Sequence, residues 1–157
     1  MAKHDELIAR YEKGVSVLEQ ALNGVPATML DRVPAPGKWA IRQLAAHVAD
    51  AEMVSNTRFR WIVAEPGAAL AGWDQDKWAT SLNYATETPA QALALVRLLR
   101  QSSARLLRSL PEEAWQRTGV HSESGVVTLE QMVEGMCNHM ENHARQVREI
   151  REKFAGK

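Results

Sequence analysis

The sequence predicts an all-α protein folded as a four-helix bundle. Apolar residues recur every three or four positions in four long segments, which is the pattern of helices that bury one face. Glycine, proline or a capping residue marks most of the segment ends. Strand-like alternation is weak throughout, and only residues 125–128 look briefly extended. Four amphipathic helices with connected apolar faces favour a bundle around a shared core.

Length and composition are those of one ordinary globular domain, which we expect to span residues 1–157. The apolar fraction is 45% and the charged fraction is 24%. A chain of this size buries about two-thirds of the surface that its unfolded form exposes. The composition therefore argues against disorder over the whole length.

The charge balance argues against a nucleic-acid partner. The 19 basic and 19 acidic residues cancel, and no basic run stands out, whereas nucleic-acid binders need clustered Lys and Arg. The N-terminal stretch has no apolar signal core, and no apolar segment is long enough to cross a bilayer, so we expect no membrane association. A single cysteine, Cys137, excludes an internal disulfide and favours the reducing cytoplasm.

The first two helices are bounded by turn residues. The first is predicted from about Leu7 to Leu22 and ends at Asn23-Gly24 and Pro26, with an extra turn or two over 27–33. A loop at 34–37 precedes the second helix, predicted from about Trp39 to about Ala64. The inner stripe of this second helix consists of Ile41, Leu44, Val48, Ala51, Ser55, Phe59 and Ile62.

Residues 65–88 form the least regular stretch. A connection of this length is usually functional or disordered. It carries Trp73, Trp78 and Tyr84, and this aromatic content favours packing back on the bundle. We therefore expect these three side chains to pack and to wall a pocket over the functional site.

Capping patterns mark the starts of the last two helices. Thr88, Pro89 and Gln91 predict a capping box for the third helix, and Thr128 with Gln131 predicts one for the fourth. Between them, 111–115 reads as a short helical turn and 117–127 as a loop with two glycines. The buried face predicted for the third helix is Leu93, Val96, Leu99, Ser103, Leu106 and Leu107; that of the fourth is Leu129, Met132, Met136, Met140, His143, Val147, Ile150 and Phe154.

Three histidines are the candidate metal ligands. His139 and His143 are four residues apart, so their imidazoles lie one turn apart on the same helix face and can reach one ion. His47 lies deep in the second helix beside its apolar stripe and can supply a third nitrogen. Three protein nitrogens leave coordination positions open for water or substrate. The alternative is that each is a hydrogen-bonded histidine of the core or its edge.

Other helical metal motifs do not fit. Zincin motifs place Glu directly after the first His or before the last one, where this chain has Met140 and Asn142. Ferritin-like di-iron sites place Glu three residues before His, where it has Leu44, Met136 and Met140. The pattern therefore argues against a carboxylate-bridged pair of irons.

Short blocks of sequence, taken together in their order and spacing, resemble the DinB/YfiT-like family of bacterial four-helix bundles. The resemblance extends from about Leu7 to Phe154, nearly the whole chain. The blocks are Pro36-Gly37-Lys38-Trp39, residues 43–52 around His47, residues 110–115, residues 128–131, and then His139, His143, Gln146, Ile150 and Arg151.

The resemblance implies an up-and-down bundle with unusual connectivity and one divalent metal ion on His47, His139 and His143. The expected ion is zinc or nickel, with iron or copper also suited to three imidazoles. Some relatives resemble metal-dependent thiol transferases or thiol-dependent isomerases, so the expected partners are a small-molecule thiol or electrophile and a second copy of the chain in a homodimer. One departure is Ala40, where the family often has the helix-capping Ser or Thr.

Several neighbouring residues have two interpretations each. Asp50, three residues after His47, could accept its second ring proton or be solvated. His121 could line the mouth of the site or be a plain loop residue. Gln146 is expected to be a helix-surface or interhelical group, and Cys137 an inert buried thiol. The sequence identifies no catalytic acid or base.

Three functions stay open at the level of sequence. The first is a metal-dependent enzyme of the thiol S-transferase or hydrolase type. The second is a non-catalytic metal- or ligand-binding protein of the stress response. The third is a structural dimeric bundle.

Overall fold

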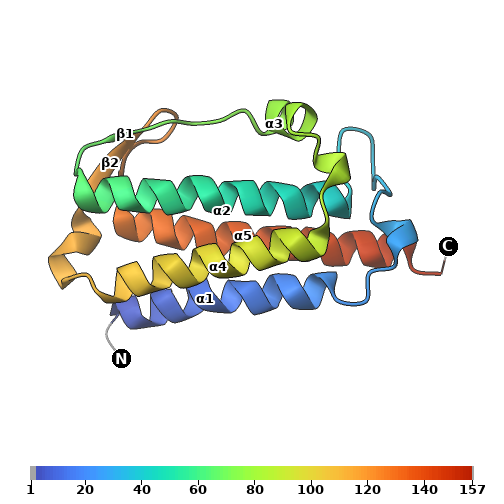
Figure 1. Cartoon of the computed structure of the whole chain (residues 1–157), viewed down its shortest axis with the longest axis horizontal. Helices are drawn as coiled ribbons and strands as arrows, with labels where there is room; N and C mark the ends of the chain where they lie inside the picture. Colours follow the sequence, from blue (N-terminus) through green and yellow to red (C-terminus); the bar gives the residue numbers. More distant parts are fainter. Residues whose placement is uncertain (1–2, 157) are drawn as a thin grey trace.

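Four long helices lie side by side in the computed structural model, which describes residues 3–156 (Figure 1). Met1, Ala2 and Lys157 of the predicted domain lie outside the described residues. The long helices are α1 (Lys3–Leu22), α2 (Ile41–Ala64), α4 (Pro89–Arg108) and α5 (Leu129–Phe154). The predicted four-helix bundle is confirmed.

The order of the helices around the bundle differs from their order along the chain. Helix α1 packs chiefly against α4 and α5, and α2 packs chiefly against the same two helices. Helices α1 and α2 therefore lie on one diagonal, and α4 and α5 on the other. The colours of Figure 1 show that α1 and α5 run in one direction and α2 and α4 in the opposite one. The segments 23–40 and 109–128 carry the chain across these diagonals.

The connections contain short elements of their own. The segment 65–88 holds strand β1 (Ala69–Leu70), helix α3 (Gln75–Ser81) and the 3-10 turn η2 (Tyr84–Thr86), and it passes along the outside of α2 (Figure 1). The first connection holds the 3-10 turn η1 (Ala27–Met29), and the last holds the turn η3 (Glu112–Gln116), as the sequence predicted. Leu70 and Tyr84 are buried, so the expectation that this segment packs back on the bundle is confirmed.

A small sheet corrects the sequence interpretation of 117–127 as a loop. Strand β2 (Thr118–His121) pairs antiparallel with β3 (Gly125–Thr128) and parallel with β1. A Cβ atom at Gly119 would lie 2.6 Å from Leu70 Cδ1, so glycine lets the two strands approach. A four-residue strand is too short to show alternation, and its parallel partner lies about fifty residues earlier, which is why the sequence did not predict it.

One of the two predicted capping boxes is present. At the start of α5, Thr128 Oγ1 accepts from the Gln131 N–H at 3.1 Å and Gln131 Oε1 accepts from the Thr128 N–H at 2.9 Å. At the start of α4 the prediction is wrong, because the Thr88 side chain makes no capping hydrogen bond. Instead, the Thr88 N–H donates to the carboxylate of its neighbour Glu87 at 2.9 Å.

The buried face of α4 is centred on a charged residue. Leu93, Leu99 and Leu106, predicted as core, are only half-buried. Arg100 is fully inaccessible, and the residues buried with it are Ala92, Val96, Ser103, Ala104 and Leu107. The buried face of α4 is therefore rotated about the helix axis relative to the face predicted from the sequence.

Arg100 forms an ion pair with Glu52 of α2 inside the bundle, and neither side chain is exposed by more than 1%. Its Nε donates to Glu52 Oε2 at 2.9 Å, and one Nη donates to the Met136 carbonyl oxygen at 2.9 Å. The Tyr11 hydroxyl donates to the other carboxylate oxygen of Glu52. A Cβ atom at Gly14 of α1 would collide with the Arg100 guanidinium, so a larger residue at this position would have to displace Arg100.

None of the helices described between residues 3 and 156 is long and apolar enough to cross a membrane.

Candidate metal centre

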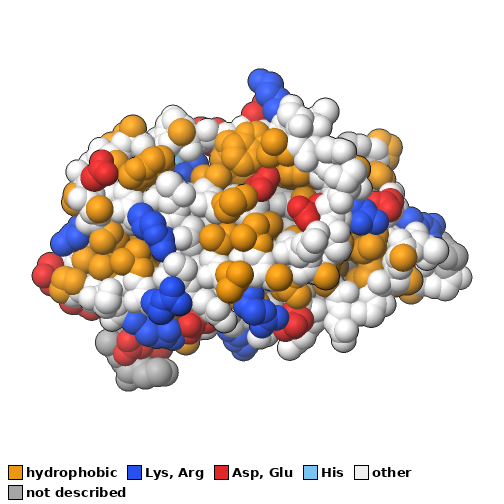
Figure 2. All heavy atoms as spheres, viewed as in Figure 1, with side chains coloured by type: hydrophobic (Ala, Val, Ile, Leu, Met, Phe, Trp, Pro, Cys, Tyr) orange, Lys and Arg blue, Asp and Glu red, His pale blue; other side chains and the backbone are white. Residues whose placement is uncertain are grey.

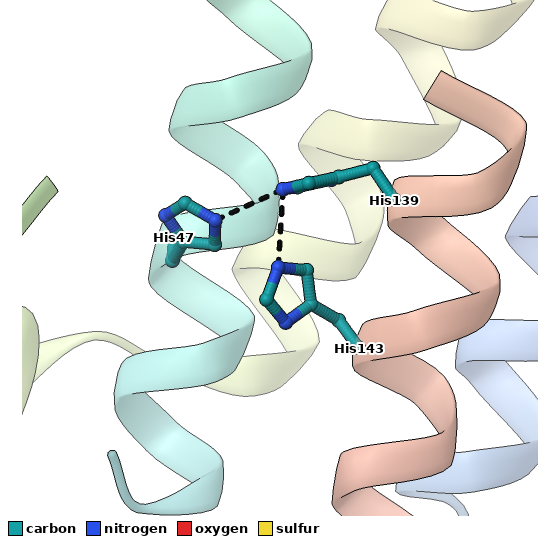
Figure 3. Close-up of side chains that lie close together, drawn as sticks. All are labelled: His47, His139 and His143. Atoms are coloured by element: carbon teal, nitrogen blue, oxygen red, sulfur yellow. Dashed lines mark hydrogen bonds between the residues drawn. The ribbon is translucent and has the colours of Figure 1, made fainter. Parts of the chain in front are cut away.

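Helices α2 and α5 bring the three predicted histidines together (Figure 3). His139 and His143 project from successive turns of α5, and His47 faces them from α2. His139 Nε2 lies 3.0 Å from His47 Nε2 and 3.0 Å from His143 Nε2. The ligand atoms of all three lie within 4.8 Å of one another.

The N-terminus of α2, the helix that carries His47, is only partly capped. Ala40 has no side-chain oxygen to cap the helix, as its departure from the family pattern implied. Gln43 compensates in part, because its Oε1 accepts from the Ala40 N–H at 3.0 Å. This contact stabilises the first turn of α2, about one turn before His47.

Burial keeps the three imidazoles neutral. It lowers the pKa of His47 to about 3 and the pKa of His139 to about 3, with the neighbouring imidazole charges as a further cause. Burial also lowers the pKa of His143, although Gln146 opposes the shift. Neutral imidazole is the form that coordinates a metal ion, so the three rings are in the binding-competent state at pH 7.

Gln146 orients His143. Its Oε1 lies 2.7 Å from His143 Nδ1, so we assign the ring proton to Nδ1, which donates to the amide oxygen and leaves the Nε2 lone pair free. The sequence interpretation did not give Gln146 this role. Its spacing of three residues from His143 is the one sequence feature that places it on the same face.

Aromatic rings hold His47. Trp39 lies 4.8 Å from the His47 ring, and Trp73 stacks on it at 5.4 Å with an interplanar angle of 24°. Trp78 packs on Trp73 at 4.4 Å, and Tyr84 lies edge-on to Trp39 at 6.4 Å. Of the aromatic residues expected to wall the site, Trp73 therefore contacts a candidate ligand directly, and Trp78 and Tyr84 lie behind the contacting rings.

Asp50 does not contact His47, which corrects one of its two sequence interpretations. Its Oδ2 accepts a hydrogen bond from the Tyr84 hydroxyl at 2.5 Å. Burial, together with this carboxylate, raises the pKa of Tyr84. The Nδ1 atoms of His47 and His139 are buried and have no hydrogen-bond partner among residues 3–156. The orientation of His47 therefore depends on ring packing.

The donor set fits a cation better than it fits hydrogen bonding alone. His143 carries its proton on Nδ1, so its Nε2 can accept a hydrogen bond from a proton on His139 Nε2. That proton is then no longer available to His47 Nε2, which is left without a hydrogen-bond donor. A metal ion gives each of the three nitrogens a partner. His47, His139 and His143 would therefore be the residues that hold such an ion.

An open cleft of about 470 Å³ reaches the triad beside His143. Its apolar wall includes Trp39 and Leu44. Its charged and polar lining comprises Lys38, Gln75, Asp76, Gln146, Glu149 and Lys153. The cleft gives a small molecule access to the Gln146 side of the site.

The remaining histidines and the cysteine lie outside the triad. His121 Nδ1 accepts from the N–H groups of Glu123 and Ser124 at 3.2 and 3.3 Å, so it stabilises the β2–β3 turn. His4, to which the sequence gave no role, stacks on Trp115 with ring centroids 4.2 Å apart. Cys137 is buried, and burial raises its pKa to about 11, which agrees with an inert thiol.

Comparison of the sequence with known proteins identifies the family of this chain. The sequence profile of the DinB superfamily matches residues 10–147. The chain belongs to the DinB superfamily. One DinB relative, from Bacillus subtilis (strain 168), is 28% identical over 147 residues, which cover 93% of this chain and 83% of the relative. It carries the name "Putative metal-dependent hydrolase YfiT". A similarly named relative from Oceanobacillus iheyensis is 26% identical and covers 88% of this chain and 80% of its own.

Solved structures confirm the DinB/YfiT-like fold. YfiT from Bacillus subtilis, described as having "an unusual four-helix bundle topology", superposes with a TM-score of 0.92 at 26% identity. The match covers 100% of this chain and 91% of YfiT. A mycothiol-dependent maleylpyruvate isomerase superposes with a TM-score of 0.74 at 16% identity, covering 92% of this chain and 60% of the isomerase, which shows a shared fold alone.

Proposed function

We propose that this DinB-superfamily protein is a metal-dependent enzyme that holds one divalent ion on His47, His139 and His143 and acts as a hydrolase or a thiol S-transferase. The observation that carries the proposal is the convergence of three neutral imidazoles, whose ligand nitrogens lie within 4.8 Å of one another. The metal-dependent hydrolase names of its relatives support the same function.

Side chains around the triad orient two of its three histidines. Gln146 fixes the tautomer of His143, and Trp39 and Trp73 hold the ring of His47. When bound, a divalent ion with three imidazole ligands supplies Lewis acidity and lowers the pKa of a water or thiol at an open position. The cleft beside His143 is the path by which a substrate reaches that position.

Hydrolysis or thiol transfer also needs a group that accepts a proton. No carboxylate among the described residues forms a hydrogen bond to the triad. Asp76 and Glu149 are the two carboxylates that line the cleft. A general base works within hydrogen-bond reach of its substrate, directly or through one water. We propose these two groups as the proton acceptors to be tested with Asp76→Asn and Glu149→Gln.

The experiment compares turnover in three preparations: metal-loaded protein, chelator-treated protein and the His143→Ala variant. The probes are a panel of small esters and amides, and pairs of low-molecular-weight thiols with alkylating electrophiles. Loading with zinc or nickel, and then iron or copper, identifies the ion that supports the reaction. We expect turnover in the loaded protein only. Equal turnover after metal removal would contradict the proposal.

A specific observation favours a second candidate, a non-catalytic metal-binding protein of the stress response. Within residues 3–156, no acidic or basic side chain other than the histidines themselves forms a hydrogen bond to the triad. Tight metal binding with no turnover across the whole panel would favour this second candidate.

We also propose that the protein is a homodimer, with a small-molecule thiol or electrophile as its substrate and the cytoplasm as its compartment. Exposed leucines on α4, Leu95 and Leu98, support a contact between copies, and the free thiol of Cys137 suits a reducing compartment. Sedimentation of the native chain beside Leu98→Glu tests the dimer. A monomer in both would contradict it, and it would also remove the structural-dimer alternative.

A further inference from the structure

The buried ion pair between Arg100 and Glu52 takes no part in the metal chemistry of the proposed function. Figure 2 shows basic and acidic side chains spread over one face of the molecular surface, whereas these two side chains lie inside the bundle and are only 1% and 0% exposed. A buried ion pair is seldom more stabilising than apolar side chains of similar volume, because both charges lose their hydration. Its place in the core therefore calls for an explanation other than stability.

Arg100 of α4 connects the two helices that carry the three histidines. Its Nε donates to Glu52 Oε2 on α2 at 2.9 Å, and one Nη donates to the Met136 carbonyl oxygen on α5 at 2.9 Å. The other Nη donates to the Tyr11 carbonyl oxygen on α1, and the guanidinium carbon lies 4.2 Å from the centre of the Tyr11 ring. A single guanidinium thus joins α4 to each of the other three long helices.

The contacts of Arg100 on α2 and α5 lie close to the triad. On α2, Glu52 is five residues after His47. On α5, Met136 is three residues before His139. Because α2 and α5 run in opposite directions, Glu52 and Met136 lie on the same side of the triad (Figure 1). The bridge therefore joins the two helices about one turn from the candidate metal ligands.

We propose that Arg100 and Glu52 are positioning residues of the metal centre, which hold α2 and α5 at the separation that the histidine triad needs. The inference rests on the proposed metal site and adds to it the residues that set its geometry. His47 is the one ligand on α2, so a shift of α2 relative to α5 changes its distance from both other ligands at once. A guanidinium suits this task because its planar fork binds several acceptors in fixed directions. Ligands that are held off the preferred geometry of an ion bind it less tightly.

The first test is Arg100→Lys, which keeps the positive charge but loses the fork that reaches both helices. The zinc affinity, measured by competition with a chelator, should fall about ten-fold, which is the effect of removing a group that orients a ligand. The absorption spectrum of bound cobalt(II) should change too, because it reports the coordination geometry. Arg97→Lys is the matched control, since Arg97 lies on the same helix but pairs with Glu19 at the surface. Native affinity and a native cobalt spectrum in Arg100→Lys would overturn the proposal.

A double substitution separates positioning from stability. Arg100→Met combined with Glu52→Leu replaces the pair by apolar side chains, which commonly restores the stability lost when a buried pair is broken. In urea unfolding of the metal-free proteins, we expect its midpoint to lie above that of Arg100→Met alone. Its zinc affinity should nevertheless stay about ten-fold below that of the native protein. Recovery of the affinity together with the stability would overturn the proposal.

Leu107→Ala is the reverse control, because it destabilises the bundle without touching the bridge. Leu107 is 1% exposed on α4, and its truncation opens a cavity in the core. We expect this variant to unfold at lower urea and to keep the native zinc affinity and cobalt spectrum. A loss of affinity equal to that of Arg100→Lys would show that the pair acts through stability alone, and would overturn the proposal.

The native protein distinguishes failure of this inference from failure of the metal site. Equal zinc affinity in the native protein and in every variant of the bridge would leave the metal site in place and overturn the positioning role alone. A native protein that takes up neither zinc nor cobalt would overturn both the metal site and the inference that rests on it.

Discussion

The amide oxygen of Gln146 lies 2.7 Å from His143 Nδ1, one turn further along α5. This contact is the single hydrogen bond from another residue to a triad ring within residues 3–156. It determines which nitrogen of His143 carries the proton and therefore which nitrogen faces the other two rings. Two of the three ligands are thus oriented in different ways: His143 by an amide, and His47 by the flanking rings of Trp39 and Trp73.

Replacing Gln146 with alanine should weaken metal binding about 10- to 100-fold, because partners of this kind orient a ligand and raise its basicity. Gln146→Glu keeps an acceptor oxygen and should retain most of the affinity. Chelator-competition titrations with zinc measure both values. An affinity of Gln146→Ala within two-fold of the native protein would show that His143 is held by packing alone.

The metal-free protein should lose stability as the pH falls from 7 to 5.5. The folded pKa values of His47 and His139 are about 3, below the ordinary value near 6.5, so the unfolded state binds more protons in this window. The stabilisation is therefore present above about pH 6.5 and is lost progressively towards the folded pKa. The loss should be about 1 kcal/mol per histidine by pH 5.5.

Urea unfolding of chelator-treated protein at the two pH values measures this loss. His139→Ala should reduce the pH dependence, whereas His121→Ala, which affects only a surface turn, should leave it unchanged. The same slope in all three proteins would mean that other groups cause the pH dependence.

Breaking the buried ion pair should be the most destabilising of the substitutions considered for the bundle. Arg100→Met leaves the Glu52 carboxylate buried without its partner and should lower the free energy of unfolding by about 3–5 kcal/mol. Arg108→Met removes an exposed arginine from the same helix, where the pair with Glu12 is largely solvated, and should cost at most about 1 kcal/mol. Chemical denaturation compares the two. Similar losses would mean that the Arg100–Glu52 pair contributes no more than a surface contact.

The sequence predicts the features of this protein that repeat at helical spacing. The four long helices, the Thr128 capping box and the common face of His139 and His143 all follow from contacts within three or four residues. His47 lies ninety-two residues from His139, and its assignment to the site drew on the resemblance to the DinB/YfiT-like family as well as on its place in the second helix.

The features that the sequence did not predict depend on partners far along the chain. Arg100 and Glu52 are forty-eight residues apart, and an apolar-stripe analysis assigns charged residues to the surface by default. Asp50 has the right local spacing to contact His47, but Tyr84, thirty-four residues away, takes its carboxylate. Strand β2 likewise depends on pairing with β1. In each case the competing interaction is tertiary.

The most direct test of the central claim is the metal content of the untagged protein, measured by elemental mass spectrometry beside His47→Ala, His143→Ala and the control His121→Ala. The account predicts about one divalent ion per chain in the native protein and in His121→Ala, and its loss in both triad variants. A native protein that carries no ion and takes up neither zinc nor nickel, or triad variants that retain the full ion content, would contradict it.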